Sequence, residues 1–263
     1  MIEAGPIHCI PGSVHPKERV RTEMIDFYYW TTPNGHKVSI FLEETGTPYK
    51  VMPVNIGKGE QFKAEFLAVS PNNRIPALVD HEPAGGGKPI SVMESGAMLV
   101  YLGEKTGQFL PKEVRARAEV MQWLFWQMGG LGPMSGQNNH FSRYAVDKLP
   151  YAIERYNKEV NRLYGVMDRR LADRPFLAGE YSIADMASYP WGVLHESQGQ
   201  KIGDFPNLKR WLDTIAARPA VQRAYELSKK INPNHGGVRT AEERAILFGQ
   251  TSASVADAAK KAS

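Results

Sequence analysis

The sequence contains one cysteine and no long apolar run, and each shortage excludes a class of protein. Cys9 is the only cysteine, so the chain can form neither an internal disulfide nor a CxxC redox pair. His8 stands beside it, but no further ligand lies nearby in the sequence to complete a metal site. No apolar segment approaches the roughly 20 residues that cross a bilayer. We therefore expect neither a bound metal nor a membrane span.

The basic residues lack the clustering of a nucleic-acid surface. Lys and Arg number 32 against 28 Asp and Glu, and they are scattered among the acids without a long run. We therefore expect no nucleic-acid partner. Hydrophobic residues make up 42% and charged residues 23%, which is typical of an ordinary soluble globular protein. A chain of 263 residues is long enough for two domains.

The two ends of the chain differ in composition from its middle. Residues 1–23 are rich in Pro, His and charge and lack the apolar core of a signal peptide, so we expect a disordered leader. Met24 directly precedes the first expected strand and is a candidate for the true start of the protein. Residues 232–263 read as a polar tail with at most one weak helix, near residues 241–248.

Residues 24–107 carry the pattern of a small mixed-sheet domain. The expected elements follow the order strand, helix, strand, helix, strand, strand, helix, which is the order of the thioredoxin-like fold. In that fold a proline before the third strand is cis, and Pro76 is placed for that role. Pro53 assigns the second strand to a sheet edge. The expected ranges are 25–30, 35–45, 49–56, 60–69, a brief strand after Pro76, 90–93 and 94–105.

The second half of the chain predicts helices only. Residues 108–114 read as a linker and residues 115–231 as an all-helical domain, in which glycines and Pro133 should break regular helix. The pair Ser182 and Asp185 has the spacing of a capping box, so we interpret Asp185 as structural. The expected helices are 115–128, 150–171, 206–217 and 220–229, with a further one after Ser182.

A strand-to-helix junction at residues 24–37 is the most chemically suggestive stretch. An aromatic-rich strand runs into Thr32 at a helix N-cap, Pro33 in the first turn and the amide of Asn34. A hydroxyl and free N–H groups at the positive end of a helix favour an anion. Tyr28 and Tyr29 precede this turn and His36 follows it; we interpret all three as structural.

These features together resemble the cytosolic glutathione transferases over residues 24–230. Within them, the segments TTPNGHKV, GKGEQF, SPNNRIPALVDH, ESGAMLVYL, QWLFWQMGGLGPMSGQNNHF and YAIERY resemble the bacterial Nu class, also described as glutathione-dependent disulfide-bond oxidoreductases. The resemblance implies a thioredoxin-like α/β domain followed by an all-α domain. It also implies a cytoplasmic homodimer that uses glutathione as co-substrate and needs no metal.

The same resemblance implies a set of site residues. Thr32 and Asn34 match the positions that stabilise the glutathione thiolate, in place of the Tyr, Ser or Cys of many relatives. Trp123, Trp126 and the turn at residues 129–137 would border the pocket of the second substrate. Contacts to the rest of glutathione are implied for the γ-glutamyl unit (Glu94, Ser95), the cysteinyl unit (Ile75 before Pro76), the glycyl end (Lys58, Gln61) and, from the helical domain, Arg155.

The absence of a cysteine near this site limits the chemistry to the sulfur of glutathione. Disulfide exchange would then use one or two bound glutathione molecules. We expect a glutathione-dependent disulfide reductase. Glutathione-dependent cleavage of a thioether or aryl ether is the alternative reaction, and a non-catalytic glutathione-fold binding protein is the alternative outside enzymes. The physiological second substrate is not encoded in any motif.

Overall fold

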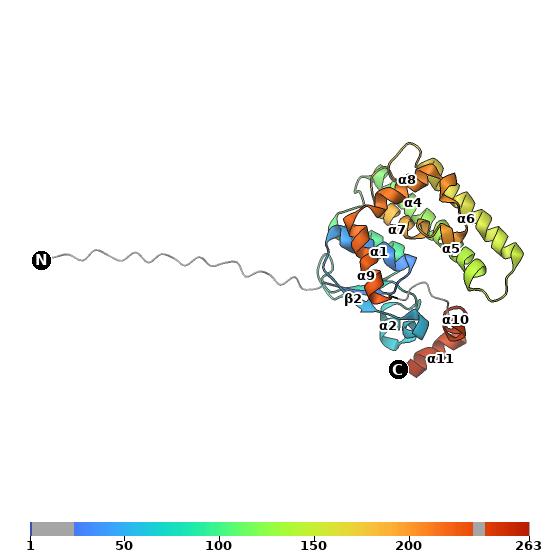
Figure 1. Cartoon of the computed structure of the whole chain (residues 1–263). Helices are drawn as coiled ribbons and strands as arrows, with labels where there is room; N and C mark the ends of the chain where they lie inside the picture. Colours follow the sequence, from blue (N-terminus) through green and yellow to red (C-terminus); the bar gives the residue numbers. More distant parts are fainter. Residues whose placement is uncertain (2–23, 234–239, 263) are drawn as a thin grey trace.

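The computed structural model describes Met1, residues 24–233 and residues 240–262. A four-stranded sheet with its helices forms the first half, and helices form the second half (Figure 1). The predicted class, a thioredoxin-like α/β half followed by an all-α half, is confirmed. The predictions of a disordered leader and of a start at Met24 concern residues 2–23, which lie outside the described residues.

The sheet has the strand order β2-β1-β3-β4. Strand β1 runs parallel to β2 and antiparallel to β3, and β3 pairs antiparallel with β4. The alternation of buried and half-buried residues along β1 places Ile25, Phe27 and Tyr29 in the core. The four strands are β1 (Ile25–Tyr29), β2 (Tyr49–Pro53), β3 (Ala77–Asp80) and β4 (Ile90–Met93).

The second strand is shorter than the sequence predicts. Strand β2 ends at Pro53 on the sheet edge, as expected for a residue without an N–H donor. The prediction that this strand extends to residue 56 is wrong. Asn55 instead caps a 3₁₀ helix, η1 (Ile56–Lys58), because its side-chain oxygen accepts a hydrogen bond from the N–H of Gly57 at 3.0 Å. The expected helix at 60–69 is likewise split, into a 3₁₀ turn, η2 (Glu60–Phe62), and α2 (Ala64–Val69).

Helix α1 (Pro33–Thr45) lies at the centre of the molecule. It begins as predicted, because the Thr32 hydroxyl oxygen accepts the N–H of Gly35 at 3.1 Å, and it ends at Gly46 with φ of 62°. It packs against α3 (Ser95–Thr106) and against α7 (Ile183–Gly192) and α9 (Pro219–Ile231) of the helical half. All residues from Gly35 to Leu42 are buried, so the first turn of α1 lies where the two halves meet.

The helical half differs from expectation at the predicted break. Helix α4 (Val114–Trp126) continues through a π-helical turn, η3 (Gln127–Leu131), into α5 (Gly132–Asn139). The π turn changes the hydrogen-bond register, which leaves Pro133 in the first turn of α5, where its missing N–H is tolerated. The remaining elements are η4 (His140–Tyr144, π-helical), α6 (Pro150–Arg170), α7 (Ile183–Gly192), η5 (Glu196–Gln198), η6 (Ile202–Asp204), α8 (Pro206–Ala216) and α9 (Pro219–Ile231).

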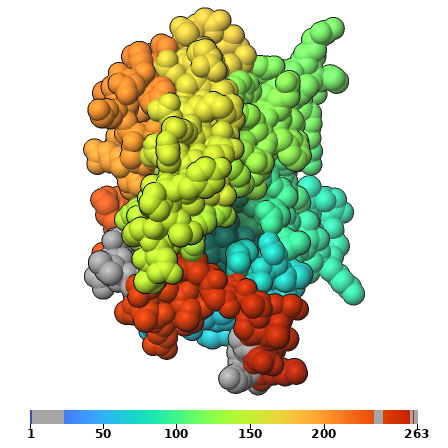
Figure 2. Space-filling model, turned by 90° about the vertical axis from the view of Figure 1, so that its right-hand side faces the viewer, coloured from blue at the N-terminus to red at the C-terminus, as the bar shows by residue number. Residues whose placement is uncertain are grey.

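The tail contains two helices, α10 (Ala241–Phe248) and α11 (Ser252–Ala262), so the prediction of at most one is wrong. A capping box of Thr240 and Glu243 begins α10, which packs on η1 in the first half. The ring of Phe248 contacts two rings of η4, His140 at 5.0 Å and Tyr144 at 5.6 Å. The tail therefore contacts both halves of the molecule. In Figure 2 it is drawn in red and lies beside a hollow in the surface. None of the helices in the described residues has the length and apolarity to cross a bilayer.

Candidate active site

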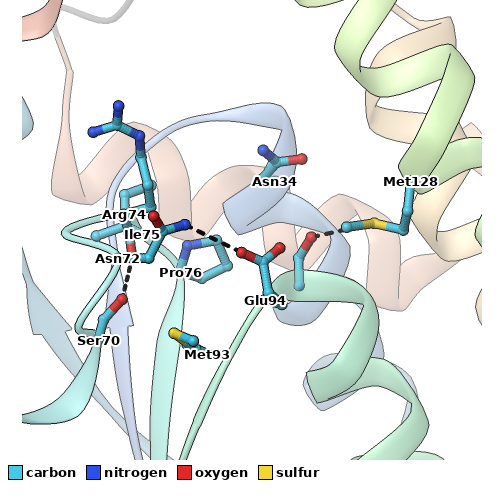
Figure 3. A pocket seen from close by; sticks show the side chains of 10 residues that line it. Asn34, Ser70, Asn72, Arg74, Ile75, Pro76, Met93, Glu94 and Met128 are labelled. Atoms are coloured by element: carbon cyan, nitrogen blue, oxygen red, sulfur yellow. Dashed lines mark hydrogen bonds between the residues drawn. The ribbon is translucent and has the colours of Figure 1, made fainter.

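A cavity of about 140 Å³ lies between the first turn of α1, the loop before β3, the start of α3 and the π turn η3 (Figure 3). Five predicted site residues line it: Asn34, Ile75, Pro76, Glu94 and Ser95. The structure thus brings together residues that are up to 61 positions apart (34 to 95). The other five lining residues, which no sequence pattern predicted, are Ser70, Asn72, Arg74, Met93 and Met128.

The start of α3 forms one wall of this cavity. Glu94 has a φ of 67°, an uncommon conformation for a residue with a side chain, and such strain is concentrated at functional sites. Its carboxylate accepts a hydrogen bond from the amide of Asn72 at 3.3 Å. Ser95 opens the helix, so its N–H lies at the positive end of α3. The wall therefore offers an acceptor for a cation beside a site for an anion.

The loop before β3 forms the facing wall. The peptide bond between Ile75 and Pro76 is cis, as predicted. The hydroxyl of Ser70 donates to the carbonyl of Arg74 at 2.9 Å, which holds the loop against the cavity. Ile75 and Pro76 therefore line the cavity together with Ser70 and Arg74 of the same loop (Figure 3).

Asn34 is oriented by a residue from the helical half. The indole N–H of Trp191 on α7 donates to Oδ1 of Asn34 at 3.2 Å. Indole is a donor only, so this bond places the amide oxygen toward Trp191 and leaves the amide nitrogen, with its two hydrogens, free to face the cavity. In Figure 3 that nitrogen points to the side of Ile75. The amide can therefore donate to an anion bound there.

Thr32 faces a second cavity, of about 290 Å³. Its walls include the first turn of α1, the end of α7 and α9, and apolar side chains such as Val193 and Leu194 line much of it. His36 also lines this cavity, and its ring stacks on Tyr225 at 4.2 Å; the structural role expected for it stays a prediction. The first turn of α1 therefore separates the two cavities, with Asn34 on one side and Thr32 on the other.

Two family matches cover most of the fold. Residues 23–104 match the N-terminal domain of glutathione S-transferase, and residues 144–219 match its C-terminal domain. Disulfide-bond oxidoreductase YfcG of Escherichia coli K12 is 54% identical over 202 residues, which are 76% of this chain and 94% of that protein. The chain belongs to the glutathione S-transferase family.

Further relatives of this glutathione transferase agree in sequence and in structure. Disulfide-bond oxidoreductase YghU of Escherichia coli K12 is 40% identical over 246 residues, covering 88% of this chain and 82% of that protein. A glutathione transferase family member from Pseudomonas fluorescens, solved with two glutathione molecules bound, superposes with a TM-score of 0.74 at 44% identity, covering 80% and 95% of the two chains. A glutathione transferase from Pseudomonas putida, with one glutathione disulfide bound per subunit, gives 0.74 at 39% identity, covering 80% and 94%.

Three predicted glutathione contacts lie outside the lining of the first cavity. Lys58 is exposed in η1. Gln61 is 2% exposed, and its amide donates to the carbonyl of Ile56 at 3.2 Å. Arg155 lies on α6 with its side chain 57% exposed, 3.7 Å from Glu159. Their roles at the glycyl end and from the helical half of this transferase stay predictions.

The two tryptophans predicted for the second-substrate pocket line neither cavity. Their rings contact each other at 5.3 Å on α4, and the guanidinium of Arg170 lies over the ring of Trp123 at 5.1 Å. Both pack against the core. A substrate pocket against Trp123 and Trp126 stays a prediction, whereas the apolar wall beside Thr32 is present in the structure.

Sequence reasoning missed Lys37, Arg74 and Trp191. Arg74 lies on the rim of the cavity, and its guanidinium donates to Oε1 of Gln250 in the tail at 2.7 Å. The sequence feature that could have pointed to Arg74 is its place directly before the Ile75-Pro76 pair. Lys37 could have been found as well, because it stands four residues before Phe41 and so on the same buried helix face.

In the described residues, no group of three or more His, Cys, Asp or Glu side chains is placed to hold a metal ion.

Trp191→Phe is expected to lower kcat by about fivefold, because loss of the indole donor frees the Asn34 amide to rotate. The fold should persist, since phenylalanine keeps most of the apolar contact of a residue that is 9% exposed. Kinetics in a double-mutant cycle with Asn34→Ala supply the control. If Trp191 acts through Asn34, its replacement should have no further effect in the Asn34→Ala background; additive effects would contradict the orientation role.

Proposed function

We propose that this protein is a glutathione-dependent disulfide reductase of the Nu class. The observation that carries the proposal is the Asn34 amide, fixed by Trp191 so that its nitrogen faces the cavity beside the start of α3. The names of the Escherichia coli relatives, both disulfide-bond oxidoreductases, support the reaction. Relatives solved with two glutathione molecules or with glutathione disulfide support the ligand.

Each part of glutathione finds matching chemistry in the cavity. The γ-glutamyl ammonium meets the Glu94 carboxylate, and its carboxylate meets Ser95 and the N-terminus of α3. The backbone beside Ile75 runs along the cysteinyl unit. This placement brings the sulfur to the first turn of α1, where Asn34 and Thr32 stand. The guanidinium of Arg74 supplies a cation on the rim.

The chain's own groups stabilise the thiolate and do not need to act as a base. A free thiol has a pKa near 8.5, so only a few per cent is ionised at neutral pH. The thiolate form of glutathione is favoured by hydrogen-bond donors: the Asn34 amide, the Thr32 hydroxyl and the backbone N–H groups at the start of α1. Lowering the thiol pKa by one unit requires about 1.4 kcal/mol, which one charge-assisted hydrogen bond supplies.

The reaction then needs two glutathione sulfurs and no protein sulfur. The first thiolate attacks one sulfur of the substrate disulfide, a new S–S bond forms, and the other substrate sulfur leaves as a thiolate that takes up a proton. A second glutathione thiolate attacks the glutathione sulfur of this mixed disulfide and releases the second substrate thiol. Two glutathione molecules are oxidised to one glutathione disulfide, and one substrate disulfide is reduced. The apolar second cavity beside Thr32 suits the substrate half of the mixed disulfide.

Turnover of a small symmetric disulfide with glutathione tests the proposal directly. We expect the rate with this disulfide to exceed the rates with a chloronitroarene, a hydroperoxide and a glutathionylated aromatic ketone by about tenfold or more. Cys9→Ser should leave kcat/KM unchanged, because the only protein cysteine takes no part. Faster turnover of the aromatic ketone thioether would favour the alternative of thioether cleavage, and loss of activity in Cys9→Ser would contradict exchange through glutathione alone.

The proposal includes a homodimer in the cytoplasm. Large apolar side chains are exposed on α4 and β4, among them Phe125 at 66% and Met93 at 39%, and an exposed apolar face is typical of a subunit interface. The cytosol keeps glutathione reduced, which this reaction requires. Sedimentation equilibrium that finds only monomer, or fractionation that finds the native protein outside the cytoplasm, would contradict these two points.

A further inference from the structure

Lys37 is a cation buried directly behind the candidate glutathione site. It lies on α1 and is 1% exposed. Its ammonium group donates to Oε1 of Gln127 at 2.6 Å and lies 3.4 Å from the hydroxyl of Ser95 and 3.3 Å from the sulfur of Met128. Ser95 and Met128 both line the cavity, so only one layer of side chains separates the ammonium group from it.

Among the described residues, no acidic side chain lies in contact with this cation. The hydrogen-bond partners that the structure gives it are a neutral amide, a hydroxyl and a thioether. Burial of an ammonium group without a paired carboxylate is costly, so such groups are retained mainly where they have a function. The positive end of α3 lies on the same side of the cavity. An anion at Ser95 would therefore be attracted by the helix and by the buried charge together.

We propose that Lys37 is a positioning residue for glutathione. Its charge, acting from behind Ser95 and Met128, holds the glutathione carboxylate that is bound at the start of α3. In turn, glutathione binding places a proton on the amine of Lys37. The inference rests on the proposed function, because it assigns Lys37 to the glutathione site. It adds to that function a coupling between ligand binding and proton uptake.

The direction of this coupling follows from the surroundings of Lys37. Burial lowers the pKa of Lys37 to about 7, and the charge of Glu94 acts in the opposite sense. A bound carboxylate raises this pKa in the complex. At a pH between the pKa of Lys37 in the free protein and its pKa in the complex, Lys37 is neutral in the free protein and charged in the complex. Binding in that window takes up a proton, and affinity falls as the pH rises through it.

The other titratable groups on the elements around α1 are engaged elsewhere. Glu94 comes from the turn before α3, and the π turn η3 contributes only neutral groups. On α7, α9 and α1, Tyr189, Tyr225 and His36 make ring contacts with one another or with Trp211, and Lys230 is exposed. The remaining groups are held by bonds to other partners: Asp185 on α7, Tyr101, Glu104 and Lys105 on α3, Arg218 at the N-cap of α9, Arg223, Glu226 and Lys229 on α9, and Glu43 and Glu44 on α1.

Isothermal titration calorimetry with S-methylglutathione tests the proposal on the full chain. This probe keeps the carboxylates and the ammonium group but has no thiol, so release of the thiol proton does not mask proton uptake. Titrations in two buffers of different ionisation enthalpy, between about pH 6 and pH 9, give the number of protons exchanged. We expect uptake approaching one proton above about pH 7. Each unit by which the ligand raises the pKa of Lys37 lowers the affinity about tenfold across the window.

Lys37→Met removes the charge and keeps a long unbranched side chain. We expect proton uptake to vanish and Kd at about pH 6 to rise about tenfold or more. The matched control is Lys209→Met on α8, an exposed lysine paired with Asp213 at 2.7 Å, which should bind as the wild type does. If Lys37→Met fails to fold, the wild-type titration still tests the coupling, because binding without proton uptake would overturn it.

The outcomes separate this inference from the proposed function. Binding of S-methylglutathione by the wild type without proton uptake would overturn the role of Lys37 and leave the function standing. Proton uptake that persists unchanged in Lys37→Met would also overturn it, because another group would then take the proton. Failure of the wild type to bind either S-methylglutathione or glutathione at millimolar concentration would overturn the proposed function itself.

Discussion

Replacing both Thr32 and Asn34 by alanine is expected to lower kcat/KM for disulfide reduction at neutral pH by about 100-fold. The proposal assigns the donors to the thiolate to these two side chains at the start of α1, and a hydrogen bond to a charged group contributes about 1.5–3 kcal/mol. The pKa of the bound thiol should rise by about two units, since one unit corresponds to about 1.4 kcal/mol. Thiolate absorbance of the glutathione complex against pH, together with pH–rate profiles, measures both effects.

The single variants assign the effect to one donor or the other. Asn34→Ala should account for most of the loss, because Asn34 lines the same cavity as Glu94 and Ser95 whereas Thr32 faces the second cavity. Thr32→Ser keeps both the hydroxyl and the helix cap and serves as the control. The lost rate should return as the pH is raised above the new thiol pKa. A pH-independent loss would show that the side chains act in another way, and no loss would assign the work to backbone donors.

Replacing Asp185 by alanine is expected to lower the free energy of unfolding by about 4 kcal/mol. The carboxylate is fully buried and accepts four hydrogen bonds, from the N–H groups of Leu177 and Ser182, the Ser182 hydroxyl and the indole of Trp211, at 2.9 to 3.1 Å. Alanine would leave these donors without their acceptor. Urea denaturation monitored by circular dichroism gives the value, with Ser182→Ala as a milder comparison.

The pH dependence of this loss has a definite sign. Burial raises the pKa of Asp185 from 3.8 to about 6, against the effect of its hydrogen bonds. A raised pKa in the folded state means that the acid contributes most at low pH and that this contribution is lost as the pH rises through about 6. The destabilisation by Asp185→Ala should therefore be larger at about pH 5 than at about pH 8. A larger effect at the higher pH would contradict the raised pKa.

Features set by neighbouring residues could be predicted from the sequence. The cap at Thr32 and the box of Ser182 and Asp185 need only a local spacing of polar side chains before an apolar run. The edge position of Pro53 follows from the missing N–H of proline. The cis bond before Pro76 was expected from the order of the elements rather than from local chemistry.

Contacts between distant residues could not be predicted in this way. Trp191 reaches Asn34 across 157 positions, and Gln127 reaches Lys37 across 90. Neither contact follows from helix periodicity, because each depends on how α1 is rotated against the helical half. The second tail helix was missed for a related reason. Its Ala-, Ser- and Lys-rich sequence has weak periodicity, and α11 packs on η2 and α2 of a different part of the chain.

The π turn η3 has a consequence for insertions and deletions in this family. A π turn holds one residue more than an α-helical turn at the same place. Deleting one residue of the Gly129-Gly130 pair would restore α-helical register and rotate one flank of the helix by about 100° relative to the other. If α5 kept its present place, Gln127 and Met128 would then no longer face Lys37 and Ser95. The length of this helix, and not only its side chains, therefore fixes the wall behind the cavity.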